Sequence, residues 1–558
     1  MTDKTENLGI NLTNMSEDGN DLFDFERDLN QPFRVIDKAV GDLQKRSTAS
    51  GIPPSNCKNL RVERNGLYYN LNWNDPKDTV INDLTLCSWG GTIIVRKAGA
   101  YPADTEDGEI VLTNTIRNAY SENAYVDTVE SDSVEYFYRA FPYSVNGVIN
   151  YDEQNKFGDI IYEFIYDPNN SNPASNITYA GRNENYTPAF MDYSKGIFNY
   201  GSWGDSFIMS LFKPCMLKYD GTVDYYLNPD DYTLRANGEP SDVANTAYEG
   251  NAMVEFAQFW IKTAQEGSKV HVYIANRQID ETYKDYMHYG EDGTLKEHVY
   301  RSLFDGCNIS NKIRSISGQA ICKNVAGNTQ ITYARANGAN WNIDAYADRV
   351  AINYLLMLIG KSTDMQTTFG NGRHKDGSAN SNNQLNTGQL IKKGMFYGDN
   401  GNGAVKVFHI ENWWGNIWKI TNGLLQTGGK WYAKMTYGTQ DGSSVTGYQQ
   451  TAVTGYIDTG VTVSGTSGGY ISGVKHVGDL GLLPQVVSGS SSTNLCDGCW
   501  WNTGIVGFAR FGGSSSSALL AGCFYLAVNN PVAYSEWNYG VALTYCIKGN
   551  KSRFCAFW

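Results

Sequence analysis

Four aspartates gather in one short polar segment and could supply a pair of catalytic carboxylates. The segment runs from Tyr219 to Tyr232 and contains Asp220, Asp224, Asp230 and Asp231. Hydrolysis of a glycosidic bond needs two carboxylates about 5–10 Å apart beside a sugar-binding cleft. The same segment is rich in turn residues, where aspartate side chains bond to nearby backbone groups. We therefore expect turn-forming aspartates, and a surface-polysaccharide depolymerase stays as a competing hypothesis.

Two further patterns could carry nucleophilic or redox chemistry. Gly465–Gly469 matches G-x-S-x-G by its letters but lacks the preceding strand and following helix that expose a nucleophilic serine, so a turn is expected. Cys496 and Cys499 form the only C-x-x-C, and no second pair completes a zinc site. The histidines are dispersed, without an H-x-x-x-H pattern. We predict reduced, buried thiols, no metal site and no cofactor.

The C-terminal segment is instead typical of a binding surface. Asn502–Gly513, followed by Ser514–Ser517, alternates small glycines and serines with large aromatics and is nearly free of charge, and Glu411–Trp418 is similar. Tyrosine and tryptophan give contact area at low entropy cost, while serine, glycine and asparagine give adaptable hydrogen bonds. Solvent-facing segments of this composition favour sugar or protein binding over catalysis.

Length and charge limit the classes of protein to consider. A chain of 558 residues exceeds one hydrophobic core, so roughly three or four domains are expected. The net charge of −13 and the lack of a basic cluster argue against a nucleic-acid partner. No apolar run approaches the roughly 20 residues that span a bilayer, and the acidic N-terminus lacks the features of a secretion signal. We therefore expect no membrane insertion and synthesis in a cytoplasm.

Residues 1–50 are expected to form an attachment or oligomerisation segment. Residues 1–20 are polar and acidic, which is typical of an arm that orders only on a partner. Apolar residues then repeat at helical spacing, at Val35, Ile36, Ala39, Val40 and Leu43. A helix this short is unstable alone, so its apolar face needs a partner. Pro53-Pro54 ends the segment in a linker.

Residues 51–155 are predicted to form a β-sandwich. Apolar side chains alternate at period two around Leu67–Trp73, Ile93–Val95 and Val134–Ala140, and Asn146-Gly147 is a hairpin-type turn. About 100 residues of short strands with an early tryptophan suit a sandwich. Leu71–Pro76, Val95–Lys97 and Tyr136–Phe141 resemble the fibronectin type III modules of phage tail proteins. The resemblance implies a spacer without chemistry.

The rest of the chain combines short strands, long loops and few helices. One strong helix is predicted from Asp344 to Gly360, and a weaker one through Leu295–Phe304. Strands are expected at Ala252–Phe256 and Val270–Ile274. The fold class is therefore mainly β with an α+β part.

A fixed order of motifs in this region resembles the receptor-binding region of phage tail-fibre and spike proteins, which carries a C-type-lectin-like fold. The motifs are Gly250–Trp260, Ile313–Gly318, Tyr333–Trp341, Phe369–Gly372, Trp413–Trp418 and the Arg510 glycine-serine run. The resemblance implies a lectin-like region over 156–330 and a receptor-binding part over 331–558. Relatives of this fold that oxidise cysteine need a reactive pair, whereas Cys523 and Cys546 lie in apolar, strand-like segments, so no oxidase is expected.

The candidate receptor-binding residues lie in loops or at strand ends of the C-terminal part. Apolar strands are expected at Ile505–Phe508, Leu519–Val528 and Val541–Tyr545, and the polar and aromatic residues between them are expected to point outward. The candidates are Trp500, Trp501, Asn502, Ser514, Ser515, Ser516, Asn529, Asn530, Tyr534, Trp537, Asn538 and Tyr539. The resembled C-type-lectin-like fold is related to the variable proteins of diversity-generating retroelements, in which the equivalent stretch contacts ligand.

These expectations combine into one functional hypothesis. The chain is expected to be a structural virion protein of a tailed bacteriophage, a non-enzymatic tail-fibre or spike adhesin that binds a host cell-surface glycan or protein. Its N-terminal region would contact other virion tail proteins, and avidity favours a homotrimer. The alternatives are an architectural tail or head component without receptor binding and, third, a surface-polysaccharide depolymerase.

Overall fold

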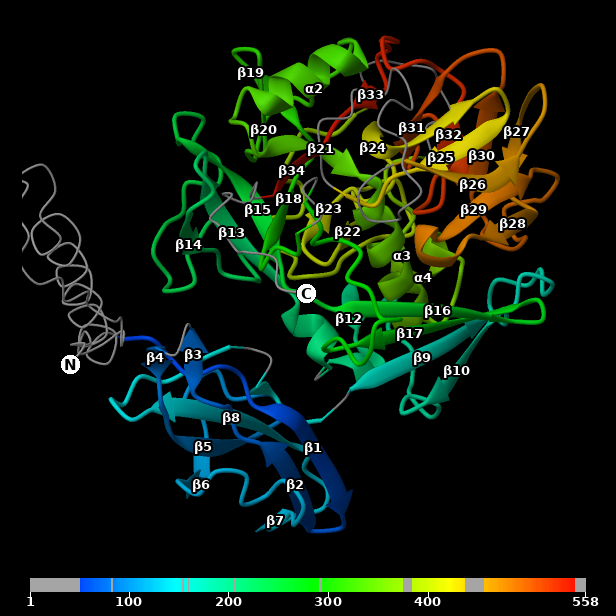
Figure 1. The fold of residues 1–558 in the computed structure, drawn as a ribbon. Helices are drawn as coiled ribbons and strands as arrows, with labels where there is room; N and C mark the ends of the chain where they lie inside the picture. The colour runs from blue at the N-terminus through cyan, green and yellow to red at the C-terminus, as the bar shows by residue number, and fades with distance from the viewer. Residues whose placement is uncertain are drawn as a thin grey trace, which may run out of the picture. The chain divides into compact units, whose positions relative to one another are not determined.

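The computed structural model describes residues 51–81, 84–152, 155–158, 160–204, 206–290, 294–374, 384–436 and 456–546. The expected N-terminal arm and the helix through Val35–Leu43 lie outside these residues. The chain divides into two compact units, Met1–Asp159 and Ile160–Trp558 (Figure 1). The fold is mainly β, with 39% strand and 9% helix, which confirms the β-rich fold class.

The first unit contains two small antiparallel sheets and a hairpin. One sheet has the order β1-β2-β7 and the other β6-β5-β8. The strands are β1 (Lys58–Asn65), β2 (Tyr68–Asn74), β5 (Trp89–Ala98), β6 (Glu109–Asn114), β7 (Tyr125–Thr128) and β8 (Tyr136–Ser144), with the hairpin β3 (Thr79–Ile81) and β4 (Leu84–Cys87). The residues after β8 run beside it, because Asn150 N–H donates to Pro142 O and Phe157 N–H to Tyr138 O, both at 2.9 Å.

Alternation along the strands builds the core of this unit. Tyr69, Leu71 and Trp73 are buried on one face of β2 and pack in one cluster with Ile94 and Tyr138 from the other sheet. The two sheets therefore share a single core. The buried Asp75 carboxylate stabilises its edge, since it accepts hydrogen bonds from the side chains at Trp73, Thr92 and Asn114.

A fourteen-stranded sheet organises the second unit. Its main path runs β14-β13-β15-β18-β34-β21-β24-β31-β32-β30-β27, and β25, β26 and β33 attach beside it. The strands are β13 (Phe212–Lys218), β14 (Val223–Tyr226), β15 (Gly250–Phe256), β18 (Val299–Ser302), β21 (Trp341–Ala345), β24 (Trp418–Thr427), β25 (Lys430–Ala433), β26 (Ile457–Thr462), β27 (Thr466–Tyr470), β30 (Gly498–Asn502), β31 (Gly507–Phe511), β32 (Leu526–Val528), β33 (Tyr539–Gly540) and β34 (Leu543–Cys546). Strands from both sides of residue 330 pair in this sheet, so residue 330 is not a structural boundary.

Smaller sheets complete the second unit. A four-stranded antiparallel sheet has the order β10-β9-β17-β16, from β9 (Ile161–Tyr166), β10 (Ile177–Gly181), β16 (Trp260–Glu266) and β17 (Lys269–Ala275). The two-stranded pairs are β11 (Phe190–Asp192) with β12 (Ile197–Asn199), β19 (Cys307–Ile309) with β20 (Lys312–Arg314), β22 (Lys406–Val407) with β23 (Ile410–Glu411), and β28 (Gly473–His476) with β29 (Leu482–Val486).

The long helix α3 (Tyr346–Gly360) is buried along its whole length. Its sequence is apolar on nearly every side, which is typical of a core helix. The expected helix is confirmed, but Asp344 lies in β21 and the helix begins two residues later. The other helices are α2 (Gly327–Arg335), α4 (Met365–Phe369) and the short 3-10 turns η3 (Gly201–Trp203), η4 (Phe207–Ser210), η5 (Gly478–Leu480) and η6 (Ala518–Leu520).

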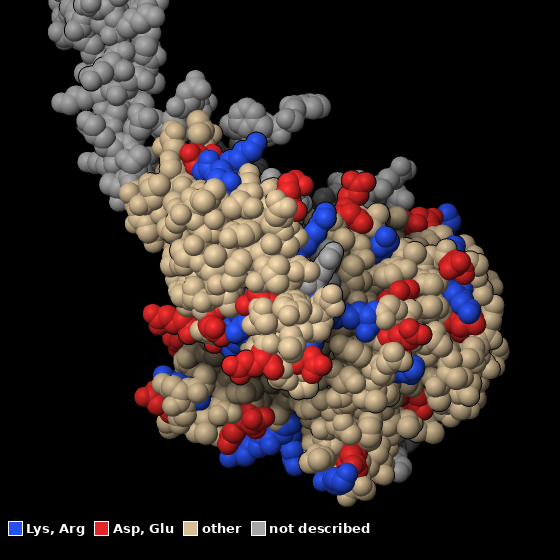
Figure 2. Space-filling model, turned by 90° about the horizontal axis from the view of Figure 1, so that it is seen from below, with Lys and Arg blue, Asp and Glu red and all other residues tan. Residues whose placement is uncertain are grey.

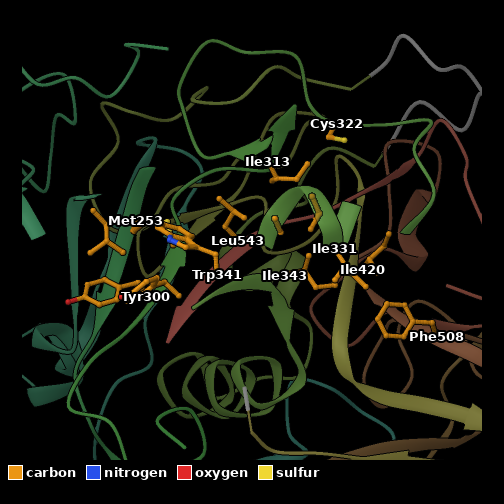
Figure 3. Packing of buried hydrophobic residues seen from close by; sticks show 14 of the residues in the cluster. Met253, Tyr300, Ile313, Cys322, Ile331, Trp341, Ile343, Ile420, Phe508 and Leu543 are labelled. Carbon is orange, nitrogen blue, oxygen red and sulfur yellow. The ribbon is translucent and has the colours of Figure 1, made fainter. Parts of the chain in front are cut away.

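The helix predicted through Leu295–Phe304 is wrong, because this segment forms β18 between β15 and β34. Every β18 side chain is buried, and pairing on both sides outweighs local helical spacing. The short helix α2 was not predicted, since its polar sequence buries only Ile331, Ala334 and a few neighbours. Figure 3 shows Ile331 within the main core cluster, near Ile343 and Ile420.

Candidate functional site

Neighbouring strands place Trp500 and Arg510 on one face of the large sheet. Trp500 in β30 lies opposite Ala527 in β32, and Ala527 lies opposite Arg510 in β31. Directly opposed side chains point to the same face of a sheet. On the other side, Trp500 lies opposite Gly468 in β27, where a Cβ atom would collide with the indole ring. Glycine at this position therefore lets the indole lie against the strand.

Five aromatic side chains follow one another through side-chain contacts or strand pairing and are called here the aromatic row: Trp500, Tyr525, Trp418, Tyr539 and Tyr534. The Trp500 indole N–H donates to the Tyr525 hydroxyl at 2.9 Å. The Tyr525 and Trp418 ring centres are 4.4 Å apart, and those of Tyr539 and Tyr534 are 5.2 Å apart. Only the ends are open to solvent, since Trp500 is 36% and Tyr534 38% exposed while the three middle rings are buried.

Arg510 joins the two halves of the aromatic row. Its guanidinium carbon lies 5.5 Å from the Trp418 ring centre and 4.1 Å from that of Tyr539, so it makes a cation–π contact on each side. Burial lowers the pKa of Arg510 to about 9, so the guanidinium remains charged at neutral pH. No carboxylate in the described residues forms an ion pair with it, and its Nε atom has no hydrogen-bond partner.

Two asparagines complete the polar part of this surface. Arg510 Nη2 donates to Asn529 Oδ1 at 2.5 Å, and the Asn530 side chain lies 2.6 Å from the Tyr539 hydroxyl. With its amide oxygen facing that hydroxyl, Asn530 also accepts from Arg510 Nη1 at 3.2 Å. Both asparagines are partly exposed. The arrangement offers amide groups beside aromatic rings, which suits hydroxyl-rich ligands.

The structure brings together Trp500, Asn529, Asn530, Tyr534 and Tyr539 from the candidates. Other candidates are corrected because their side chains are buried, namely Trp501, Ser514 and Ser515, and Tyr539 is also only 7% exposed. Trp501 follows Trp500 in β30 and therefore points to the opposite face, where its indole N–H donates to Ser464 O at 3.1 Å.

The remaining candidates are partly buried and make local contacts. The Asn502 side chain accepts from Gly504 N–H at 3.0 Å, within its own turn. Asn538 donates to Ser514 Oγ at 3.5 Å, and Ser516 Oγ lies 3.2 Å from the same atom. The Trp537 backbone N–H donates to the Glu536 carboxylate at 3.3 Å. These residues support loops beside the aromatic row.

Three residues of this surface are not among the candidate residues: Trp418, Tyr525 and Arg510, although Trp418 and Arg510 lie in the two segments predicted to be typical of a binding surface. Arg510 is the only charged residue between Asp497 and Glu536. A single charge in such an aromatic segment is the sequence feature that could have indicated its role. Trp418 is the last residue of the tryptophan-rich motif, and Tyr525 lies within the segment Leu519–Val528, whose apolar pattern predicts a buried strand.

The tryptophan-rich motif is core rather than exposed binding surface, which corrects the expectation for Glu411–Trp418; Trp418 contributes only as a buried middle member of the aromatic row. Trp413 and Trp414 are fully buried. The guanidinium carbons of Arg349 and Arg301 lie 3.8 and 4.4 Å from the Trp413 ring centre, and both arginines pair with the Asp344 carboxylate. The motif therefore fixes the start of β24, and with it Trp418, against α3.

A second buried ion pair holds the same turn. Lys419 Nζ lies 3.1 Å from Asp305 Oδ1, and the Asn412 and Asn416 amides donate to Asp305 Oδ2 at 2.9 and 2.8 Å. Both asparagines adopt positive φ values of 55° and 62°, which asparagine tolerates better than most residues. The turn before β24 is thus fixed by charge, hydrogen bonds and backbone conformation together.

The aspartates considered for catalysis have local partners. Asp220 accepts from Thr222 N–H at 2.9 Å and Asp231 from Thr233 N–H at 3.0 Å. The Thr222 N–H lowers the pKa of Asp220, and the Thr233 hydroxyl, which donates to Asp231 Oδ1 at 2.6 Å, lowers the pKa of Asp231, whereas a glycosidase acid needs a raised pKa. Lys218 Nζ pairs with Asp224 at 2.8 Å. Asp220 and Asp231 therefore have the geometry of turn-forming residues, while Asp224 lies in β14.

The other chemical motifs also take structural positions. Ser467 of the G-x-S-x-G match lies inside β27, not in the expected turn. Burial raises the pKa of the Cys496, Cys499 and Cys523 thiols, which keeps them protonated. Within the described ranges, no three His, Cys, Asp or Glu side chains are grouped closely enough to hold a metal ion. No helix among these residues is long and apolar enough to cross a membrane.

The face of the molecule shown in Figure 2 carries mixed charge. Figure 2 shows acidic and basic side chains interspersed on the displayed face, without a continuous basic area there. Comparisons with known proteins add no family assignment, because no protein-family model matches the chain and no curated protein is significantly similar to it.

Proposed function

We propose that this chain is a non-enzymatic adhesin of a tailed-phage virion, a tail-fibre or spike protein that binds a glycan or protein on the host cell surface. The aromatic row with Arg510 and its asparagines is the proposed receptor site. One observation carries the proposal: two partly exposed rings, Trp500 and Tyr534, end the aromatic row, and the partly exposed Asn529 and Asn530 contact its Arg510 and Tyr539. Rings that stack on sugar carbons beside amides that bond hydroxyls are a common way to hold glycans.

The rest of the chain is proposed to present this site. The first unit would act as a fibronectin type III-like spacer, which its two antiparallel sheets around one core support. The second unit would be C-type-lectin-like, which agrees with a rigid sheet, few helices and long loops. The N-terminal region would bind other tail proteins and form a homotrimer, because several weak sites acting together raise avidity.

Retention on host surface glycan, followed by sizing of that glycan, tests the proposal. The full chain is incubated with glycan extracted from susceptible cells and the complex is collected. Retention with glycan of unchanged length supports an adhesin. Shortened glycan supports a depolymerase instead, and the absence of retention on both glycan and whole cells supports a purely architectural protein.

A further inference from the structure

The carboxylate of Glu536 lies at one open end of the aromatic row, beside Tyr534. The Tyr534 hydroxyl donates to Glu536 Oε2 at 3.0 Å, and this hydrogen bond lies at the protein surface. The Tyr534 ring is 38% exposed, and Ser535 between the two residues is exposed as well. A ligand that stacks on the Tyr534 ring would therefore lie within reach of the Glu536 carboxylate.

Backbone and side-chain hydrogen bonds hold Glu536 in position. Its carbonyl oxygen accepts from Asn324 N–H at 3.1 Å and from Tyr539 N–H at 3.2 Å. Its carboxylate is bonded by the Tyr534 hydroxyl on Oε2 and by the Trp537 N–H on Oε1, the latter at 3.3 Å. Because the carboxylate is oriented before a ligand arrives, binding costs less ordering of this side chain.

The Glu536 carboxylate keeps free acceptor capacity. An ionised carboxylate offers about four lone-pair positions on its two oxygens. Among the described residues, Tyr534 occupies a position on Oε2 and Trp537 occupies a position on Oε1, so each oxygen can accept another hydrogen bond. Two adjacent hydroxyls of a sugar are donors that match such a pair of acceptors, and hydrogen bonds to an ionised group are stronger than neutral ones.

The negative charge of Glu536 is not neutralised at the surface. No cationic side chain in the described ranges forms an ion pair with it. Arg510, the cation of the aromatic row, is only 4% exposed, lies against the buried Tyr539 ring and donates to Asn529. A ligand at the Tyr534 end therefore meets an open carboxylate, whereas the guanidinium is almost wholly covered. Like charges at this distance repel, so an acidic group on the ligand is disfavoured there.

We propose that the receptor site selects neutral sugar units over acidic ones, with Glu536 as its specificity-determining residue. Glu536 accepts hydrogen bonds from two adjacent sugar hydroxyls and repels sugars that carry a carboxylate or a phosphate. This inference rests on the proposed receptor site and specifies the class of ligand that the site takes.

Retention of the full chain on fractionated host surface glycan tests this selection. Glycan from susceptible cells is separated by anion exchange into a neutral and an acidic fraction, and both are immobilised at equal sugar content. At low salt we expect at least about tenfold stronger retention on the neutral fraction, because an unscreened like charge opposes binding of the acidic one. At about 1 M salt the Debye length falls to about 3 Å, so this preference should shrink.

Glu536→Gln tests the residue itself. The substitution keeps the size of the side chain but removes its charge and one acceptor oxygen. We expect weaker retention on the neutral fraction and a neutral-to-acidic ratio within about threefold of one at both salt concentrations. Glu239→Gln makes the same change at a side chain that is 63% exposed, between β14 and β15, and it should keep the wild-type ratio.

The outcomes separate this inference from the proposed function. Equal wild-type retention on both fractions, or stronger retention on the acidic one, would overturn the selection and leave the adhesin standing. A wild-type ratio in Glu536→Gln would overturn the role of Glu536. Cell attachment without retention on either fraction would indicate a protein receptor and also overturn this inference alone. A chain that neither attaches to cells nor binds either fraction would contradict the proposed adhesin itself.

Discussion

The Arg510 guanidinium carbon lies 4.1 Å from the centre of the Tyr539 ring, and among the described residues no acidic side chain pairs with this arginine. Aromatic faces and asparagine amides take the place of the carboxylate that usually accompanies a buried guanidinium. Arg510 therefore fixes the orientation of Asn529, Asn530 and Tyr539 at once.

Replacing Arg510 should weaken receptor binding through these neighbours. Arg510→Met keeps much of the side-chain volume but removes the N–H groups that donate to both asparagines. Arg510→Lys keeps the positive charge but loses the planar guanidinium group with its several N–H donors. We expect roughly tenfold weaker retention on host glycan for each variant, equivalent to about 1.4 kcal/mol. Glycan retention of folded protein, checked by circular dichroism, measures the effect. Wild-type retention by both variants would show that Arg510 does not organise the site.

Gly468 should be required for the position of the Trp500 ring. A Cβ atom at this residue would overlap the indole, so Gly468→Ala should displace Trp500 from its hydrogen bond with Tyr525. We expect weaker glycan retention and a shift in tryptophan fluorescence. Gly204→Ala is the control, since its Cβ would make only an ordinary 3.6 Å contact with Tyr200. Equal retention by the two variants would contradict the role given to Trp500.

Buried His409 should make the folded chain sensitive to acid. Burial, then the nearby Lys406, lowers the pKa of His409 from 6.5 to about 3. Between these values the unfolded chain binds a proton that the folded chain does not, so the stability present above pH 6.5 is lost as the pH falls toward 3. The loss is at most about 1.4 kcal/mol per pH unit.

Urea unfolding at neutral pH and at about pH 5 measures this dependence. His409→Asn should flatten it, because asparagine tolerates the φ of 66° at this position and does not titrate. If the free energy of unfolding of His409→Asn depends on pH as strongly as that of the wild type, other groups cause the acid sensitivity.

The N-terminal region should control oligomerisation. The helical spacing of Ile36, Val40 and Leu43 in the sequence predicts one apolar face that needs a partner. Light scattering should give a trimer for the full chain and a monomer for a chain beginning at Gly51. A full-length monomer, or a trimer that persists after the deletion, would contradict this assignment.

Local sequence patterns predicted the elements whose stability is mainly local. The alternation of Tyr69, Leu71 and Trp73 gave β2, and the apolar run ending at Gly360 gave α3. Pairing between strands that are distant in the sequence could not be predicted. The local pattern around Tyr300 predicts a weak helix, because the sequence near it carries no information about the strands β15 and β34 that pair with β18.

The candidate site could be predicted only in part, because local patterns predict some of its residues and long-range strand pairing decides the others. Asn529, Asn530 and Tyr534 follow a recognisable apolar strand, so their exposure could be inferred. The alternation of β30 separates Trp500 from Trp501, and only the register with β32 decides which one shares a face with Arg510. Trp418 joins the row through its parallel pairing with Tyr539, more than a hundred residues later in the chain.

Attachment of the Trp500→Ala, Tyr534→Ala double variant to host cells tests the central claim most directly. Both side chains are partly exposed, so their truncation should leave the fold and assembly intact. Aromatic residues at the centre of an interface contribute roughly 2 kcal/mol or more each, so the double variant should lose attachment by well over a hundredfold. Val80→Ala with Val126→Ala, two exposed positions in the first unit, provides the control. Attachment of the folded double variant at the control level would contradict the assignment of the receptor site to the aromatic row.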